Sequence, residues 1–177
     1  MGNRKLLNIE LGRVSAQEYK ELPDSGLVVV LDNIRSAHNV GSAFRTADSF
    51  KIDKVYLCGI CAVPPSAEIH KSALGAEDSV MWEHVDDTMD VVTRLRSEGY
   101  VIVSADQAVD SVLLDTFRPS MDCRYAVVFG NEVAGVRQDV VAASDMVLEI
   151  PQFGPQHSLN ISVPAGIVLW HCHCAKK

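Results

Sequence analysis

The stretch EIPQFGPQHSLNISVPAG, residues 149–166, combines the features of a core strand, a polar loop and a core helix. It begins like the end of a buried strand and passes through Gly154 and Pro155. It then presents a polar cluster made of His157, Ser158, Asn160 and Ser162. Small and apolar residues follow, and they predict a closing helix over 158–175, with Pro164 in its first turns. A cluster of hydrogen-bonding side chains between a core strand and a core helix requires an explanation.

Apolar runs and helical patterns alternate along the chain on either side of this stretch. Short runs rich in β-branched residues predict strands at 27–34, 54–60, 101–107, 125–130 and 145–151. Helical spacing predicts helices at 40–50, 87–98, 136–144 and 158–175. The connection 62–78 contains too much proline to form one helix. This alternation predicts one α/β domain over 27–177, a mostly parallel sheet with helices on both faces, preceded by a short arm over 1–26.

Bulk composition is that of a soluble globular protein, with 177 residues, 47% apolar and 22% charged. No apolar run approaches the length of a membrane span, and the N-terminus shows no signal peptide, so we expect a cytoplasmic protein without a membrane partner. The net charge of −7 argues against non-specific coating of nucleic acid. It allows a local basic patch in the N-terminal half, formed by Arg4, Lys5, Arg13, Arg35, Arg45 and Lys71.

Five cysteines occur, an odd number that favours reduced thiols in a cytoplasm. The pairs in CGIC (58–61) and in the tail HCHC (171–174) suggest zinc. However, Cys58 and Cys61 flank the end of an apolar run, where cysteine acts as a small buried hydrophobe. Adjacent residues in HCHC would need a loop to converge on one ion, and the spacing is half of a zinc pattern. We therefore expect packing and no metal.

Polar loops follow three of the predicted strands, at 32–48, 129–135 and 150–162. None contains GxGxxG or GxSxG, and GNEVAG (130–135) lacks the lysine and hydroxyl of a P-loop. Singly, each loop has an ordinary explanation: Asn39 and Ser158 as helix caps, Gly130 and Gly135 in tight turns, or Arg45 as a solvated arginine paired with Glu132. Together they follow parallel strands, whose carboxyl ends share one edge of a sheet. The polar groups are therefore expected to converge on one crevice.

The order of these loops resembles the SpoU (TrmH) family of the SPOUT class, S-adenosylmethionine-dependent RNA 2′-O-ribose methyltransferases. NIRSAHNVGSAFRTAD resembles the first motif, FGNEVAGV the second and IPQFGPQHSLNISVPAG the third, while IHKSALGAE resembles a segment between motifs. The similarity runs from Leu27 to Trp170. Two departures are Gln152, where methionine is usual, and Pro164, where alanine is usual; both leave local helix geometry in question.

The resemblance implies a C-terminal trefoil knot, an exception to the rule that chains avoid knots. The cofactor would lie against the knot, with the polar side chains of 158–162 facing a ligand and Leu159, Ile161 and Val163 packed behind them. It also implies a homodimer through two helices, with contacts from Ala43, Phe44, Ile167, Val168 and Trp170. The expected substrate is tRNA, with rRNA as the alternative. Selection of that RNA would fall to the domain, the short arm or a partner protein.

Site roles also come from the resemblance. Arg45 would grip phosphate and polarise the ribose hydroxyl, because a guanidinium stays protonated and is a poor base; the proton acceptor is left open. Asn39 and Glu132 would hold Arg45 and the ribose, and Ser158 and Asn160 would bind RNA or orient Arg45. Contacts to the cofactor would come from Ala105, Gly130, Asn131, Ile150 and Leu159. A non-catalytic RNA- or cofactor-binding module is the rival hypothesis, and the presence of Arg45, Glu132 and Asn160 counts against it.

Overall fold

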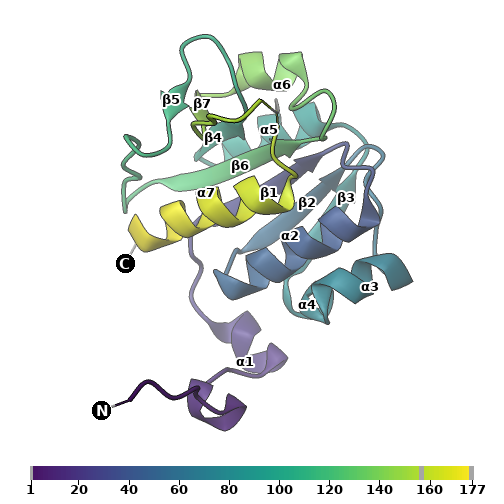
Figure 1. Cartoon of the computed structure of the whole chain (residues 1–177). Coiled ribbons are helices and arrows are strands. Elements are labelled where there is room, and N and C mark those ends of the chain that lie inside the picture. The colour runs from purple at the N-terminus through teal and green to yellow at the C-terminus, as the bar shows by residue number, and fades with distance from the viewer. Residues whose placement is uncertain (1, 156–157, 176–177) are drawn as a thin grey trace.

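A seven-stranded sheet forms the centre of the computed structural model, which describes residues 2–155 and 158–175 (Figure 1). The strand order is β3-β2-β1-β6-β4-β7-β5, and every neighbouring pair is parallel. The strands are β1 Leu27–Asp32, β2 Lys54–Cys58, β3 Met81–Val85, β4 Tyr100–Ala105, β5 Val112–Leu113, β6 Arg124–Gly130 and β7 Met146–Glu149. The predicted α/β class with a parallel sheet is confirmed.

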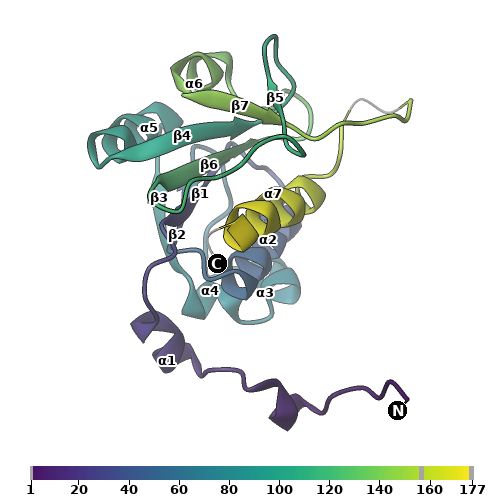
Figure 2. The same cartoon turned by 90° about the vertical axis from the view of Figure 1, so that its left-hand side faces the viewer.

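Helices cover both faces of the sheet (Figures 1 and 2). One face carries α2 Ala37–Ser49, α3 Ala67–Ala73, α4 Ala76–Ser79 and α7 Ser162–Ala175, and the other carries α5 Thr88–Ser97 and α6 Gln138–Ala143. Alternate residues of β1 belong to different cores: Val29 and Leu31 pack toward α2 and α7, whereas Val28 and Val30 pack toward α5 and α6. A strand buried on both faces therefore reads as the unbroken apolar run LVVVL.

The segment before β1 contains two short helices, the 3-10 helix η1 Asn8–Leu11 and α1 Ala16–Glu21. Ser15 caps α1 by accepting a hydrogen bond from the Glu18 amide. Tyr19 joins the core, and its hydroxyl donates to the Ala47 carbonyl at 3.3 Å. The segment otherwise extends away from the body of the molecule (Figure 2).

Two predicted boundaries were wrong for identifiable reasons. The closing helix begins at Ser162 and not at residue 158, because the Asn160 carboxamide accepts from the Ser162 amide and ends the preceding loop. Helix α2 begins at Ala37, three residues before the predicted start, because Ser36 is its N-cap. Pro164 is the third residue of α7, where its missing N–H removes no intrahelical bond. His157 lies outside the described residues.

The sequence interpretation missed two edge strands, β3 and β5. β3 has the sequence MWEHV, is partly exposed along its length and carries three polar or amphipathic side chains, so it lacks an apolar run. β5 is only two residues long. The proline-containing connection 62–78 forms the short helices α3 and α4. None of the described helices has the length and apolar character needed to cross a membrane.

Candidate cofactor and RNA site

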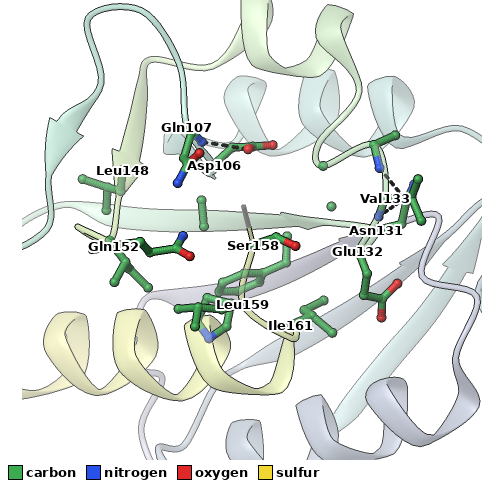
Figure 3. A pocket seen from close by; sticks show the side chains of 17 residues that line it. Asp106, Gln107, Asn131, Glu132, Val133, Leu148, Gln152, Ser158, Leu159 and Ile161 are labelled. Atoms are coloured by element: carbon green, nitrogen blue, oxygen red, sulfur yellow. Dashed lines mark hydrogen bonds between the residues drawn. The ribbon is translucent and has the colours of Figure 1, made fainter. Parts of the chain in front are cut away.

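A cavity of about 320 Å³ opens at the carboxyl ends of β4, β6 and β7 (Figure 3). Ligand pockets in α/β sheets lie at this edge, and the volume is at the lower end of the range for small-molecule sites. Seven of the ten predicted site residues line it: Ala105, Gly130, Asn131, Glu132, Ile150, Ser158 and Leu159. The cavity thus brings together the predicted loops after β6 and β7 and the end of β4, whereas no residue of the predicted loop 32–48 lines it.

The loop after β6 is folded tightly on itself. Asn131 Oδ1 accepts hydrogen bonds from the Val133 and Ala134 amides at 3.0 and 2.9 Å, and the Gly135 amide donates to the Asn131 carbonyl at 2.9 Å. Gly135 has a φ of +69°, a conformation that favours glycine. Gly130 packs directly against the returning backbone, since a Cβ there would lie 1.9 Å from the Gly135 carbonyl carbon. Asn131 thus shapes the loop through its side chain.

The first and second loops are joined by a hydrogen bond from Asn39 Nδ2 to Glu132 Oε1. Asn39 lies within α2 and is 6% exposed. Its carboxamide is therefore held between the helix and the loop that follows β6, residues 131–135, which we call the cavity loop. Its explanation as a helix cap was wrong, because Ser36 caps α2 and accepts from the Asn39 amide at 3.3 Å. Glu132 pairs with Asn39 and not with Arg45.

Arg45 lies outside the cavity, on the exposed side of α2. Its side chain lines a neighbouring groove together with His38, Lys71 and Phe50, and Gly166 of α7 closes the groove. Among the described residues, nothing accepts a hydrogen bond from the Arg45 guanidinium. Lys71 is paired with Glu68 at 2.6 Å, whereas the unpaired guanidinium of Arg45 is suited to an anionic ligand such as a phosphate group.

The third loop divides its polar residues between two roles. Ser158 and Leu159 line the cavity, whereas Asn160 Oδ1 accepts from the Ser162 amide and hydroxyl at 3.0 and 2.7 Å and so caps α7. Leu159 is 36% exposed and reaches the cavity wall, whereas Ile161 is buried in the core as expected and also lines the cavity. Val163 is 44% exposed and contributes to neither the cavity nor the core.

Three polar residues of the cavity were missed by the sequence interpretation: Asp106, Gln107 and Gln152. Figure 3 shows Asp106 and Gln107 on one side of the cavity and Gln152, Ser158 and Leu159 on the other. Asp106 directly follows Ala105 at the end of β4, so its place at a strand terminus was a usable signal. Pro164, one of the two departures from the family pattern, also lines the cavity.

The cysteines behave as packing residues where the structure describes them. Burial raises the pKa of the Cys58 thiol to about 12 and that of Cys61 to about 11, so both stay protonated and unreactive near neutral pH. Cys172 lies in the core, while Cys174 is exposed. Residues 2–155 and 158–175 contain no group of three or more His, Cys, Asp or Glu side chains placed to hold a metal ion. The absence of zinc stays a prediction.

The model of the SpoU rRNA Methylase family matches residues 26–170. The chain belongs to this family. The matched range contains all three polar loops and all seven strands, so the family assignment and the cavity rest on the same part of the molecule.

Named relatives of this SpoU family chain act on different RNAs. It is 37% identical over 153 residues to the 23S rRNA (guanosine-2'-O-)-methyltransferase RlmB of Nitrosomonas europaea, covering 84% of this chain and 56% of the relative. A structure of the A. aeolicus TrmH/SpoU tRNA modifying enzyme has a TM-score of 0.78 and 26% identity, and the match covers 90% of this chain and 81% of that one. The structure of an AdoMet-bound rRNA methyltransferase from Sinorhizobium meliloti has a TM-score of 0.77 and 25% identity, and the match covers 87% of this chain and 59% of that one. The chain spans little more than half the length of the Nitrosomonas relative.

Replacing Gly130 by alanine is expected to damage the cavity. The added Cβ would lie 1.9 Å from the Gly135 carbonyl carbon and 2.0 Å from the Val136 nitrogen, both of which are backbone atoms that cannot rotate aside. Overpacking of this kind costs about 1–3 kcal/mol of unfolding free energy. Thermal unfolding should show a lower melting temperature, and calorimetry should show at least roughly tenfold weaker binding of S-adenosylmethionine. In Gly166→Ala the added Cβ meets open space, so neither the melting temperature nor the affinity for the cofactor should fall. Equal behaviour of the two variants would contradict the packing argument.

Proposed function

We propose that this SpoU family chain transfers a methyl group from S-adenosylmethionine to a ribose 2′-hydroxyl of RNA. The observation that supports the proposal is a cavity lined by the loops after β6 and β7, with Asn39 of α2 bound to Glu132 in its wall. Helix α7 contributes to both the cavity, through Pro164, and the groove that contains Arg45 and Lys71, through Gly166. A cofactor and a phosphate-bearing substrate thus have adjacent sites.

The residues that line the cavity suit S-adenosylmethionine in their chemistry. Phe129, Leu148, Ile150 and Leu159 offer apolar surface for an adenine ring, and Gly130 permits close approach of a ligand to the backbone. Bound there, the cofactor would supply a methyl group that its positive sulfur already activates. The protein's share of the work would then be orientation and stabilisation of the hydroxyl as it loses its proton.

The chain's own side chains would divide this work between them. Arg45 would bind a phosphate of the RNA and polarise the target hydroxyl, as its exposed and unpaired guanidinium allows. Asn39 and Glu132 would fix the position of α2 relative to the cavity loop and hold the ribose. Ser158 faces the cavity and would contact cofactor or RNA, whereas Asn160 would act by fixing the start of α7. The proton acceptor is not assigned.

Several finer features belong to the same proposal. We infer that residues 27–177 form the methyltransferase domain and residues 1–26 an arm, that the C-terminal segment is knotted, and that the enzyme works in the cytoplasm. The relatives' names include both tRNA and rRNA enzymes. We propose tRNA as the substrate, with rRNA as a second candidate favoured by the 37% identity to the Nitrosomonas relative.

The proposal is tested by incubating the purified chain with methyl-labelled S-adenosylmethionine and total RNA, fractionated into tRNA and rRNA. We expect label in 2′-O-methylated nucleosides after complete digestion of the tRNA fraction. If the label appeared in rRNA alone, the proposed substrate would change from tRNA to rRNA, and the proposed reaction would stand. Cofactor binding without transfer to either RNA would favour a non-catalytic binding module.

We propose that the active protein is a homodimer formed through α7. Val163, Ile167 and Trp170 are 44%, 41% and 54% exposed on this helix, and Trp170 lies against Phe50 with ring centroids 5.6 Å apart. Val168 is fully buried in the core and is therefore not part of such a surface, contrary to the sequence-based expectation; Ala43 and Phe44 are buried as well.

Light scattering at micromolar concentration is expected to give about twice the chain mass of 19.3 kDa. Trp170→Glu should shift the mass to that of one chain, because a charge would be buried in an apolar contact. Ile60→Glu is the matched control, since Ile60 is 58% exposed and lies in the loop after β2 and not on α7. A wild-type protein that is monomeric and active would refute the dimer.

A further inference from the structure

Asp106 lies at the end of β4, between the cavity and the loop that follows β6. One of its carboxylate oxygens, Oδ1, accepts a hydrogen bond from the Gln107 amide at 2.7 Å. The other, Oδ2, accepts from the Val136 amide at 2.7 Å. A Cβ on Gly135 would lie 2.3 Å from Oδ2, so the carboxylate packs directly over this glycine. Asp106 therefore holds the exit of the cavity loop.

A second carboxylate holds the next amide of the same loop. Asp32, at the end of β1 and 1% exposed, accepts from the Arg137 amide at 2.8 Å. β1 and β4 are the two neighbours of β6 in the sheet, so the loop leaving β6 is fixed from both sides. The two carboxylates differ in their surroundings: Asp32 is enclosed in the protein, whereas Asp106 also lines the cavity.

The cavity has an unbalanced charge. Its 17 lining residues include the carboxylates of Asp106 and Glu132 and contain no lysine, arginine or histidine in the part of the chain that the structure describes. The basic side chains nearby, Arg45 and Lys71, line the separate groove. A carboxylate has about four lone-pair positions, so two amide bonds do not exhaust Asp106 as an acceptor or neutralise its charge. The cavity therefore favours a cation.

We propose that Asp106 selects the ligand by charge, giving the cavity a preference for the sulfonium cofactor over its thioether product. This inference rests on the proposed function. S-adenosylmethionine and S-adenosylhomocysteine differ by one methyl group and by the positive charge on sulfur. A carboxylate in the cavity wall attracts the first through that charge and has no such attraction for the second. The same residue that shapes the loop would thus help to exchange product for fresh cofactor.

Binding calorimetry with both ligands separates this charge effect from a merely structural role. In Asp106→Asn we expect the affinity for S-adenosylmethionine to fall about fivefold more than the affinity for S-adenosylhomocysteine, as for a single charge acting through a partly solvated site. A purely structural residue would weaken both ligands by the same factor. Asp106→Glu keeps the charge but moves it, so both affinities should fall while their ratio stays near that of the wild type.

Asp110→Asn is the matched control, because Asp110 is exposed in the same loop, does not line the cavity and has a φ of 64° that asparagine tolerates. It should leave both affinities unchanged. If Asp106→Asn fails to fold by circular dichroism, Asp106→Ser tests the same ratio with a neutral acceptor for the Val136 amide. Equal weakening of both ligands in the neutral variants would overturn the inference and leave the proposed function intact. A wild-type protein that binds neither ligand would overturn the proposed function itself.

Discussion

Replacing Arg45 by alanine is expected to leave the protein folded and to lower the rate of methyl transfer about 100-fold or more. The side chain is exposed on α2 and makes no hydrogen bond or ion pair within the described chain, so its loss should change the unfolding free energy by less than about 0.5 kcal/mol. Contacts made in the transition state, by contrast, are worth several kcal/mol each. Single-turnover rates with saturating cofactor and RNA, compared with thermal unfolding, measure both quantities.

Arg45→Lys should not restore the rate, because an ammonium cannot reproduce the planar fork of a guanidinium. Arg118→Ala serves as the control, since within the described chain the Arg118 guanidinium donates only to carbonyls of its own loop, those of Asp115 at 2.7 Å and Phe117 at 2.9 Å. That variant should keep its full rate. If Arg45→Ala retained full activity, the role assigned to the first loop would be wrong at its central residue.

An RNA substrate with a single 2′-deoxy target nucleotide is expected to accept no methyl group at that nucleotide. The acceptor proposed here is the ribose oxygen, and without it no position remains for the new bond. Once the modified nucleotide is mapped, mass spectrometry of digested oligonucleotides measures the loss. The control is the same RNA with the deoxy sugar one nucleotide away, which should still be methylated. Methylation of the deoxy target itself would show that the acceptor is a base atom.

The convergence of the loops after β6 and β7 was predictable because it depends on a simple property of parallel sheets, whereas the loop 32–48 reaches the cavity wall through the hydrogen bond of Asn39 to Glu132. Each loop follows an apolar strand, and all carboxyl ends of such strands lie at one edge. Strands β1, β2 and β6 were also predictable. Their runs LVVVL, VYLC and YAVVF are buried on both faces, so their apolar composition was enough to identify them. β3 was missed because an edge strand needs no such run.

The supports of the site were not predictable in the same way. Asp32 and Arg137 are 105 positions apart, and Asp106 and Val136 are 30 apart. In each case a carboxylate accepts a hydrogen bond from a backbone amide. Every residue except proline has such an amide, so the identity of the donor residue cannot be predicted from the sequence. The capping role of Asn160 was hidden for a related reason, because the start of α7 depends on where the preceding loop ends.

The position of β6 between β1 and β4 has a consequence for how the protein is made. During synthesis, β3, β2 and β1 can pair as soon as residue 85 has emerged, but the free edge of β1 has no neighbour until residues 124–130 are available. β4 waits for the same strand. Such long-range parallel pairing is slow, and an unpaired strand edge invites association with other chains. The nascent chain therefore exposes the unpaired edge of β1 until β6 is complete, and the second edge of β4 until β7 follows at residues 146–149.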